Sequence, residues 1–229
     1  MANESETAVR FVREVQAQCA AFSFLNVMHY TIFDRACTDG TADLLRELRL
    51  SGLQVVDACK SRCVVDAYMR GYKQALDDGA DWILEIDAGF SHAPKDIPKL
   101  LHAMSEGYDC VFGSRFCKGG QMLDAPLGRR VTSYGGTLLS NLLLGTRLTD
   151  MTSGFELFTR KALEAILARG IVSRGPFFQT EIKAFAHRFN ICEVPITYTS
   201  PSHIVSQAAL MDAFGALWRL FKLRLNQQL

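Results

Sequence analysis

The sequence predicts an α/β fold built on a doubly wound, mostly parallel sheet flanked by helices. Helix and strand patterns alternate along the chain, as parallel α/β folds require. A buried strand pattern over 81–87 (DWILEID) ends in the acidic residue Asp87, at the strand end where open α/β sheets bind ligands. With 229 residues, 48% of them hydrophobic, the chain can form a full core, so we expect a single domain over 1–229.

Each element is expected from its own local pattern. Apolar residues at helical spacing, with capping residues and helix stops, predict helices over 5–20, 39–48, 64–77, a segment opened by Pro94, 130–144, 161–169, 177–188 and about 206–225. Short apolar runs bounded by polar or turn residues predict strands over 24–33, 53–58, 81–87, 109–116 and 191–198. The segment 119–126 is the most loop-like, and we expect an active-site loop there.

Composition and charge exclude several classes of protein. The net charge of +1 argues against a nucleic-acid binder that depends on a strong basic field. No apolar run is long enough to cross a bilayer, and the charged first twenty residues lack the apolar core of a signal peptide. The seven cysteines include no C-x-x-C pair, which is typical of reduced thiols in a cytosolic protein. We therefore expect a cytoplasmic protein.

Asp87 is the first candidate for chemistry. A carboxylate at the end of a central strand can hold a hard divalent cation against a diphosphate. The alternative is that Asp87 only caps the turn that follows. The segment IDAGFSHAP (86–94) alone does not decide between them.

Five further motifs, with a closing strand, surround this segment in a fixed order. They are FDRACTDGTADLLREL (33–48), RCVVDAYMRGYKQAL (62–76), GSRF (113–116), DMTSGFELFTRKAL (150–163), FFQTEIKAFAHR (177–188) and, in the strand, EVPITY (193–198). In this order and spacing they resemble the inverting family 2 glycosyltransferases, closest to the dolichyl-phosphate mannose synthases and related bacterial enzymes. The resemblance covers roughly residues 3–210, and the ordered set is far more specific than any one motif.

The resemblance implies a GT-A fold that binds a nucleoside-diphosphate sugar. Asp34 matches the aspartate that contacts the nucleotide base, and Asp87 matches the first aspartate of the D-x-D motif, next to the sugar diphosphate and a divalent cation, Mg²⁺ or Mn²⁺. Asn3 and Glu4 match the end of the family's first motif, and Arg62 opens the segment before the central strand. We expect these five residues to bind the donor.

On the acceptor side the resemblance implies a cluster of polar residues. Asp150, Thr152 and Ser153 match a D-x-T-S-G-F segment, and Gln179 and Glu181 match a polar pair on the following helix. For Glu181 the alternative is a buried structural carboxylate paired to a neighbour.

Arginines are expected to complete the site. Arg115 matches an arginine near the donor phosphates or the acceptor, and Arg129 or Arg130 could supply a cation for an acceptor phosphate. Four residues are taken as catalytic: Asp87, Asp150, Arg115 and Glu181.

The chain departs from the family at several positions. The D-x-D motif ends in Gly89, so one metal ligand is missing, and Ser91, His92, water or the diphosphate itself must complete the shell. For His92 the alternative is a cap on the helix that opens at Pro94. Arg35 replaces an aspartate in the 33–48 motif, and the segment 201–207 lacks the Arg and Lys of the family, which puts polyprenyl-phosphate recognition in question.

The largest departure concerns the start of the fold. Family members begin with a strand that ends in P-x-Y-N-E, whereas this chain begins M-A-N-E. We therefore expect a sheet whose first strand is missing and whose two neighbouring strand edges are exposed. Unpaired backbone groups at those edges predict marginal stability or self-association, with weak or absent transferase activity.

The expected reaction is transfer of a sugar from a nucleoside-diphosphate sugar to an acceptor, such as a polyprenyl phosphate, with inversion. A lipid phosphate is already largely ionised at pH 7, since its second pKa is about 6, and needs positioning more than a base. A hydroxyl acceptor would need a base, and Asp150 is the candidate.

Three other functions predict different sequence features. The first alternative is a degenerate, non-catalytic relative that binds a nucleotide or a partner subunit, which Arg35 and Gly89 favour. A nucleotidyltransferase would need a Gly-rich basic loop near its start, and a dehydrogenase a G-x-G-x-x-G turn after a strand; neither motif is present.

The C-terminal helix over about 206–225 is amphipathic. Its apolar residues Leu210, Phe214, Leu217, Trp218 and Phe221 lie beside Arg219, Lys222 and Arg224. Such a helix can lie in a membrane interface, here at the inner face of the membrane. The alternative is a helix packed on its own domain or on a second subunit in a homodimer.

Overall fold

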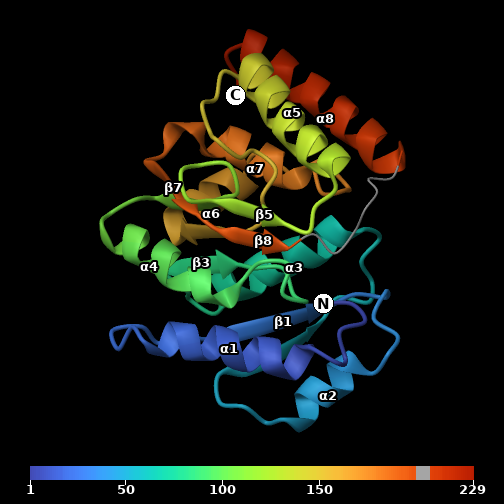
Figure 1. Cartoon of the computed structure of the whole chain (residues 1–229), viewed down its shortest axis with the longest axis vertical. Coiled ribbons are helices and arrows are strands. Elements are labelled where there is room, and N and C mark those ends of the chain that lie inside the picture. Colours follow the sequence, from blue (N-terminus) through green and yellow to red (C-terminus); the bar gives the residue numbers. More distant parts are fainter. Residues whose placement is uncertain (200–206) are drawn as a thin grey trace.

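The structure is a computed structural model of the chain, and it describes residues 1–199 and 207–229 (Figure 1). The helices are α1 (Ala8–Ala20), α2 (Thr41–Glu47), α3 (Val64–Asp77), α4 (Ile97–Ser105), α5 (Leu127–Leu144), α6 (Arg160–Leu167), α7 (Phe178–Phe185) and α8 (Gln207–Leu225), with single turns η1 (Pro94–Asp96) and η2 (Ala186–Arg188). The strands are β1 (His29–Phe33), β2 (Leu53–Asp57), β3 (Trp82–Glu85), β4 (Cys110–Ser114), β5 (Gln121–Leu123), β6 (Glu156–Thr159), β7 (Ile191–Pro195) and β8 (Thr197–Thr199). The departure expected at 201–207 falls on residues outside this description, except for Gln207.

The strands form three sheets, where one was expected. The largest has the order β3-β6-β4-β7, in which β6 is antiparallel to β3 and β4 while β4 and β7 are parallel. β1 and β2 form a separate parallel pair, and β5 and β8 form another. The predicted α/β fold with largely parallel pairing is therefore present, with the strands divided among separate sheets and β6 antiparallel to its two neighbours.

The strand β6 was not predicted from the sequence, although it occupies the centre of the largest sheet. It has only four residues and runs directly into the N-cap of α6 at Thr159, so no turn residue separates the strand from the helix. The predicted late strand is also divided, because β7 ends at Pro195 and β8 pairs with the loop-like segment through β5.

Two apolar layers cover the four-stranded sheet. On one face Phe11 of α1 and Leu100 of α4 pack with Val111 and Leu157. On the other face the apolar residues of α3, α6, α7 and α8 pack against side chains such as Phe158. Neighbouring strand residues alternate between these layers, as a sheet buried on both faces requires.

The helix α1 also joins the four-stranded sheet to the β1–β2 pair. Ala8 and Val12 pack against Phe33 of β1 and Leu45 of α2, whereas Phe11 faces the four-stranded sheet. All of these side chains are almost fully buried. The detached β1–β2 pair is therefore connected to the rest of the domain through α1 and through α3, which contacts β1 directly.

The helices α5 and α8 lie side by side at the end of the molecule opposite β1 and β2 (Figure 1). Leu217 and Leu220 bury α8 in the same core as α7. The alternative of a C-terminal helix packed on its own domain is thus present in the structure. Within residues 1–199 and 207–229, every helix is too short or too polar to span a bilayer.

Candidate active site

Asp87 follows β3 and is held between two side chains. The hydroxyl of Tyr68 on α3 donates a hydrogen bond to Oδ1 of Asp87, and Nδ1 of His92 lies 3.6 Å from Oδ2. Burial, reinforced by the charge of Asp87, raises the pKa of Tyr68 well above its usual value, so the phenol remains a donor. The Asp87 side chain is 37% exposed and can also meet a ligand. Tyr68 was not singled out from the sequence.

Three of the predicted donor residues meet at the carboxyl ends of β1 and β3. Glu4, Asp34 and Asp87 line one cavity together with Tyr68 and the first residue, Met1. The ammonium of Met1 donates to the carbonyl of Ile32 at 2.6 Å. Burial lowers the pKa of that ammonium, while the nearby charges of Asp34 and Asp87 oppose the shift.

Asn3 and Arg62 do not line this cavity. Asn3 Oδ1 accepts a hydrogen bond of 2.9 Å from the amide of Thr38, so it fixes the turn before α2. Arg62 is largely exposed, 3.6 Å from Asp66, and its carbonyl accepts a bond from Arg35. Their roles in donor binding stay predictions.

The position of Gly89 explains why no second aspartate follows Asp87. Gly89 has φ +75°, a conformation that side-chain-bearing residues rarely adopt, and a Cβ there would lie 2.5 Å from Oε1 of Glu4. The Glu4 carboxylate therefore occupies the space beside Gly89. Thr7 holds that carboxylate with a 2.8 Å hydrogen bond.

The residues around Asp87 fit a cation held by few protein ligands. In the described part of the chain, no three His, Cys, Asp or Glu side chains are arranged as a metal site. Ser91 Oγ is directed to the carbonyl of Ala88. His92 is buried with neither ring nitrogen hydrogen-bonded, and burial lowers its pKa to about 4, which leaves a neutral imidazole. One carboxylate and this imidazole suit an ion whose remaining ligands are diphosphate oxygens and water.

His92 does not cap the helix that opens at Pro94, because no side chain caps that turn. Its backbone pairs with Tyr198 of β8, and its ring packs against Phe155 and Tyr198 at centroid distances of 5.4 and 5.2 Å. The ring therefore links the donor side of the site to β8.

Arg115 and Asp150 form the centre of the acceptor side. Arg115 Nε and Nη2 donate to the two carboxylate oxygens of Asp150 at 2.7 and 2.8 Å, and Nη2 also donates to the hydroxyl of Thr152. Burial alone would raise the pKa of Asp150, but the hydrogen bonds and charge of Arg115 outweigh it and lower that pKa. The carboxylate is therefore ionised and committed to the arginine.

Two residues that the sequence did not single out hold this pair in place. The Glu193 carboxylate on β7 accepts hydrogen bonds from the amides of Thr149 and Asp150. Ser114 Oγ lies 2.6 Å from the Thr149 hydroxyl and accepts hydrogen bonds from the backbone amides of Phe116 and Cys117. These bonds fix the start of the 150–163 motif against β4 and β7.

A second cavity, of about 630 Å³, opens beside Arg115. Arg130 on α5 lines it too, and its guanidinium donates to the carbonyls of Met122 and Ala125, which ties α5 to the loop containing β5. The other lining residues are Phe116, Gly120, Gln121, Met122, Leu123, Val131 and Tyr134. Arg129 does not line this cavity, and its Nε is buried without a hydrogen-bond partner. Arg115 and Arg130 therefore present two cations to one pocket with several apolar walls.

A buried polar network connects the two sides beneath the sheet. Glu85 on β3 accepts hydrogen bonds from Tyr72 and from Gln179 on α7. Lys183 pairs with Glu156 and donates to the carbonyl of Ser153. Burial raises the pKa of Glu85 well above its usual value and that of Glu156 to about 7.

This network places two predicted acceptor residues away from open space. Gln179 and Ser153 are 5% and 1% exposed, whereas Thr152, like Asp150, contacts Arg115 directly. Roles in acceptor contact for Gln179 and Ser153 stay predictions, and their contacts are those of supporting residues.

The structure places Glu181 away from both cavities. Its carboxylate accepts the amides of Val172 and Ser173 and the Ser173 hydroxyl, and it pairs with Arg219 of α8. These contacts fix the loop before α7 and attach α8. They correspond to the structural alternative for Glu181, and its catalytic role stays a prediction.

Comparison with known sequences agrees with this arrangement. The family model described as glycosyl transferase family 2 matches residues 1–167. Polyprenol monophosphomannose synthase from Mycolicibacterium smegmatis is 32% identical over 223 residues, covering 95% of this chain and 82% of that protein. Undecaprenyl-phosphate mannosyltransferase from Micrococcus luteus is 34% identical over 171 residues, covering 73% of this chain and 70% of that protein.

Comparison with solved structures concerns the fold. Glucosyl-3-phosphoglycerate synthase from Mycobacterium tuberculosis, solved with Mn²⁺, UDP and phosphoglyceric acid, matches with a TM-score of 0.60 at 18% identity, over 100% of this chain and 75% of that one. Mannosyl-3-phosphoglycerate synthase from Rubrobacter xylanophilus matches with a TM-score of 0.64 at 18% identity, over 100% of this chain and 73% of that one. The predicted GT-A fold is confirmed by these neighbours. With the family match and the two sequence relatives, they show that the chain is a glycosyltransferase that belongs to glycosyl transferase family 2.

Proposed function

We propose that the protein transfers a hexose, with mannose as the first candidate, from a nucleoside-diphosphate sugar to a polyprenyl phosphate. The two curated relatives carry names that specify mannose transfer to polyprenyl phosphates. The chain aligns with one over 82% of its length and with the other over 70%. The donor would bind on the Asp87 side of the site, and the acceptor would bind on the Arg115 side.

The observation that carries the proposal is the state of Asp150. A general base works best with a pKa near the working pH, whereas Asp150 is buried, paired with Arg115 and lowered in pKa. A hydroxyl acceptor would find no free base at this position. A phosphate acceptor is already ionised and needs cations that hold it in line with the donor. Arg115 and Arg130 are suited to that task, because a guanidinium N–H donates a charge-assisted hydrogen bond to a phosphate oxygen. Nε and Nη2 of both arginines are already donors within the protein, so each would offer its Nη1 to the phosphate.

On the donor side, Asp87 and His92 would hold a divalent cation, Mg²⁺ or Mn²⁺, with Asp34 next to the nucleotide. When bound, such a cation neutralises the charge that develops on the departing nucleoside diphosphate. Tyr68 orients the Asp87 carboxylate toward the cavity. Attack by the acceptor from the face opposite the leaving group would invert the anomeric configuration.

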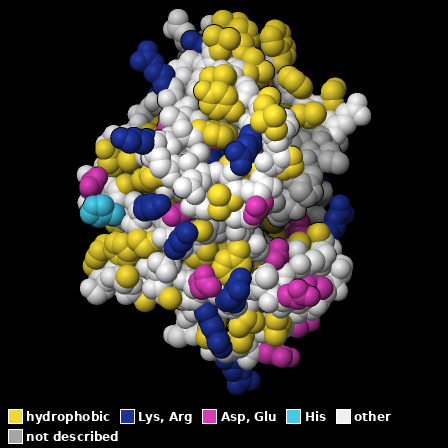
Figure 2. Space-filling view, viewed as in Figure 1, with side chains coloured by type: hydrophobic (Ala, Val, Ile, Leu, Met, Phe, Trp, Pro, Cys, Tyr) yellow, Lys and Arg dark blue, Asp and Glu magenta, His cyan; other side chains and the backbone are white. Residues whose placement is uncertain are grey.

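A membrane contact would bring the enzyme to a lipid acceptor. The helices α5 and α8 expose two apolar stripes, which Figure 2 shows as hydrophobic side chains gathered at the top of the molecule. The α5 stripe consists of Leu127, Val131, Tyr134, Leu138 and Leu142, and the α8 stripe of Leu210, Met211, Phe214, Trp218 and Leu225. Val131 and Tyr134 also line the Arg115 cavity, so the α5 stripe leads directly to the proposed acceptor pocket.

The cations on α8 contribute less to membrane binding than the sequence suggested. Arg219 pairs with Glu181, and Arg224 donates to the carbonyls of Leu142 and Leu143 on α5. Lys222 lies 5.4 Å from the Trp218 ring. Apolar burial would therefore dominate the contact. All seven cysteines are free thiols, as is typical of a reducing compartment, which supports attachment at the cytoplasmic face. A second copy packed against the same stripes, in a homodimer, is the alternative.

The direct test is product formation with detergent-solubilised polyprenyl phosphate, nucleoside-diphosphate mannose and Mg²⁺ or Mn²⁺. We expect a mannosyl-phosphate lipid whose anomeric configuration, determined by NMR, is opposite to that of the donor. A product with the same anomeric configuration as the donor would contradict an inverting mechanism. Donor binding without transfer to lipid phosphate or release of sugar would identify a degenerate, non-catalytic relative.

A further inference from the structure

The carboxylate of Glu4 lies where the side chain of a second aspartate after Asp87 would lie. A Cβ at Gly89 would be 2.5 and 2.8 Å from Oε1 and Oε2 of Glu4, and 2.9 Å from its carboxyl carbon. Standard bond lengths place the carboxylate oxygens of an aspartate about 2.4 Å from their own Cβ. Glu4 therefore brings two oxygens to nearly the same distance from position 89, although it comes from a different part of the chain.

The backbone and the side chain of Glu4 are both fixed. Its amide donates a hydrogen bond of 3.0 Å to Oγ1 of Thr41, and its carbonyl accepts hydrogen bonds from the amides of Thr7 and Ala8 at the start of α1. The Thr7 hydroxyl donates to Oε2 at 2.8 Å. A carboxylate held in this way can bind an ion without first being ordered, as functional sites require.

Neither Glu4 nor Asp87 is neutralised by a basic side chain. In the part of the chain that the structure describes, no Lys or Arg pairs with either carboxylate, and no group donates a hydrogen bond to Oε1 of Glu4. The charges of both carboxylates act on the ammonium of Met1, so they lie near one point, but that ammonium donates to the carbonyl of Ile32. Two carboxylates near one point repel each other, and a divalent cation bound by both removes the repulsion.

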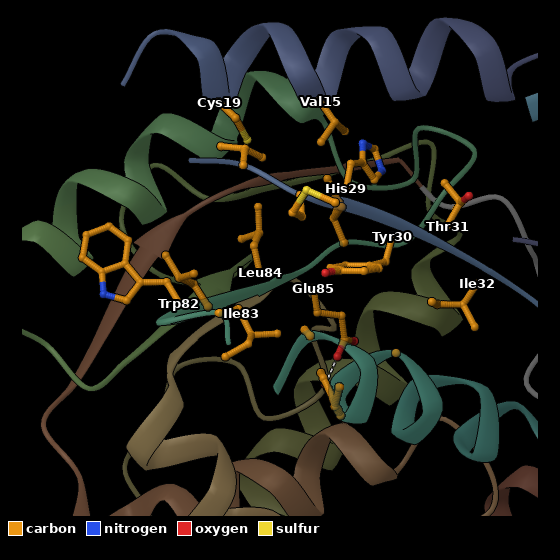
Figure 3. Close-up of a pocket in the computed structure, with 18 of the residues that line it drawn as sticks. Val15, Cys19, His29, Tyr30, Thr31, Ile32, Trp82, Ile83, Leu84 and Glu85 are labelled. Atoms are coloured by element: carbon orange, nitrogen blue, oxygen red, sulfur yellow. Dashed lines mark hydrogen bonds between the residues drawn. The ribbon is translucent and has the colours of Figure 1, made fainter. Parts of the chain in front are cut away.

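The cavity that these two carboxylates line has mostly apolar walls. Its volume is about 940 Å³, and it lies beside α1, β1 and β3, where most of the side chains labelled in Figure 3 are apolar. The one carboxylate labelled there, Glu85, accepts hydrogen bonds from Tyr72 and Gln179 and is not free to bind an ion. Apolar walls lower the local dielectric, which strengthens the attraction between a carboxylate and a cation.

A buried imidazole beside Asp87 is a second, independent sign of a ligand. His92 is 1% exposed, and neither of its ring nitrogens has a hydrogen-bond partner among the described residues. Its Nδ1 lies 3.6 Å from Oδ2 of Asp87, which is too far for a hydrogen bond. Buried polar atoms almost always have partners in native proteins, so an orphan of this kind is expected beside a bound ion or its water.

We propose that Glu4 is a ligand of the donor-side cation and replaces the carboxylate that Gly89 lacks. Asp87 and Glu4 would supply two carboxylates to Mg²⁺ or Mn²⁺, and the donor diphosphate and water would complete the shell, with His92 beside Asp87. Hard cations are commonly held by one or two carboxylates together with substrate phosphates. In the described residues no three His, Cys, Asp or Glu side chains form a metal site by themselves, which agrees with a shell that the donor completes. This assignment rests on the donor-side cation of the proposed function, and it moves Glu4 from the nucleotide to the metal.

The test separates binding of the metal from binding of the nucleotide. Calorimetric titrations of UDP and of GDP are compared in Mn²⁺ and in EDTA, and the ratio of the two affinities measures the coupling between cation and nucleotide. We expect a ratio of at least about ten for the original chain and loss of most of it in Glu4→Gln, with the affinity in EDTA unchanged within about twofold. Glu6→Gln makes the same change at an exposed residue two positions further on and should keep the ratio.

Moving the carboxylate between two positions tests the geometry. Glu4→Ala should lose the ratio, and the double variant Glu4→Ala, Gly89→Asp should regain it to within about threefold, because the new aspartate then meets no other carboxylate. The control is Glu4→Ala, Gly79→Asp, which adds an aspartate at a glycine with φ +87° and open space around it. Melting curves show which variants are folded, and if a double variant does not fold, Glu4→Gln alone decides the question.

Equal losses of affinity in Mn²⁺ and in EDTA for Glu4→Gln would place Glu4 on the nucleotide and overturn the assignment. An unchanged ratio in Glu4→Gln, with the ratio lost in Asp87→Ala, would also overturn it and would leave the proposed function intact. Equal rescue by Gly79→Asp would show that only the net charge matters, against the geometry described. A ratio near one in the original chain would contradict both the role of Glu4 and the cation of the proposed function.

Discussion

The guanidinium of Arg115 and the carboxylate of Asp150 form a two-point ion pair in which the residues are 5% and 0% exposed. The pair joins β4 to the segment before β6 and is itself fixed by Glu193. It leaves one edge of Arg115 at the acceptor cavity while removing Asp150 as a free base. Stability and acceptor chemistry are thus linked at one contact.

Replacing Asp150 with alanine should destabilise the protein by about 3–5 kcal/mol, because it leaves the Arg115 charge buried and unpaired. Urea unfolding followed by circular dichroism measures the change. The control is Asp43→Ala, which breaks an exposed pair with Arg46 and should change stability by about 1 kcal/mol or less. Equal effects of the two substitutions would contradict the structural role of the buried pair.

The double variant Arg115→Met, Asp150→Leu should regain much of the stability that Asp150→Ala loses, because it leaves no buried charge unpaired. It should regain no transferase activity.

The pH dependence of kcat/KM should follow the acceptor. The folded-state pKa of Asp150 lies below its usual value, so the carboxylate is ionised throughout the neutral range and gives no acid limb there. The ionised Asp150 carboxylate stabilises the folded state at pH values above its unfolded-state pKa. This stabilisation is lost as the pH falls through its folded-state pKa. Activity should instead rise as pH increases through about 6, where the lipid phosphate loses its second proton. A phosphonate acceptor with a higher second pKa should move this limb upward; a limb that stays in place would point to an enzyme group.

Introducing the family's second aspartate at position 89 should lower both donor affinity and stability. Gly89→Asp introduces a side chain at φ +75° and against the Glu4 carboxylate, so it should weaken donor binding and lower stability by more than the roughly 1–2 kcal/mol of left-handed strain. Gly79→Asp is the matched control, since Gly79 has φ +87° and open space around its Cβ position. Thermal melts and calorimetric donor titrations measure both effects. Tighter donor binding by Gly89→Asp would show that Glu4 does not occupy the space we assign to it.

Membrane binding should depend on the apolar stripe of α5. Leu142→Glu alters a side chain that is 75% exposed and should reduce co-sedimentation with anionic liposomes about tenfold, because it replaces apolar burial with a charge. Phe24→Glu, at an apolar residue that is 64% exposed and outside both stripes, is the control and should change little. Point substitution is preferred to deleting α8, since Leu217 and Leu220 belong to the core. Unchanged sedimentation, together with a dimer that Leu142→Glu dissociates, would assign the stripe to subunit contact.

The sequence was sufficient for much of the fold and for the ends of its central strands. Val64–Asp77 and Trp82–Glu85 follow strong local patterns, and Asp34 and Asp87, each predicted at the end of a strand, line one cavity. What could not be predicted depends on contacts between distant segments. Gln179 bonds to Glu85 across 94 positions, and Glu181 is bound by Arg219, a partner that no local pattern identifies. The strand β6 was missed because its four residues lie between a compact turn and a helix cap.

The central claim is that the acceptor brings its own negative charge to Arg115 and Arg130. The most direct test compares initial rates of sugar transfer to a polyprenyl phosphate and to the corresponding polyprenol, with the same donor and cation. We predict at least about hundredfold faster transfer to the phosphate, with no transfer by Asp87→Ala. Equal rates with the alcohol would contradict the account, because they would require a base that the Arg115–Asp150 pair does not provide.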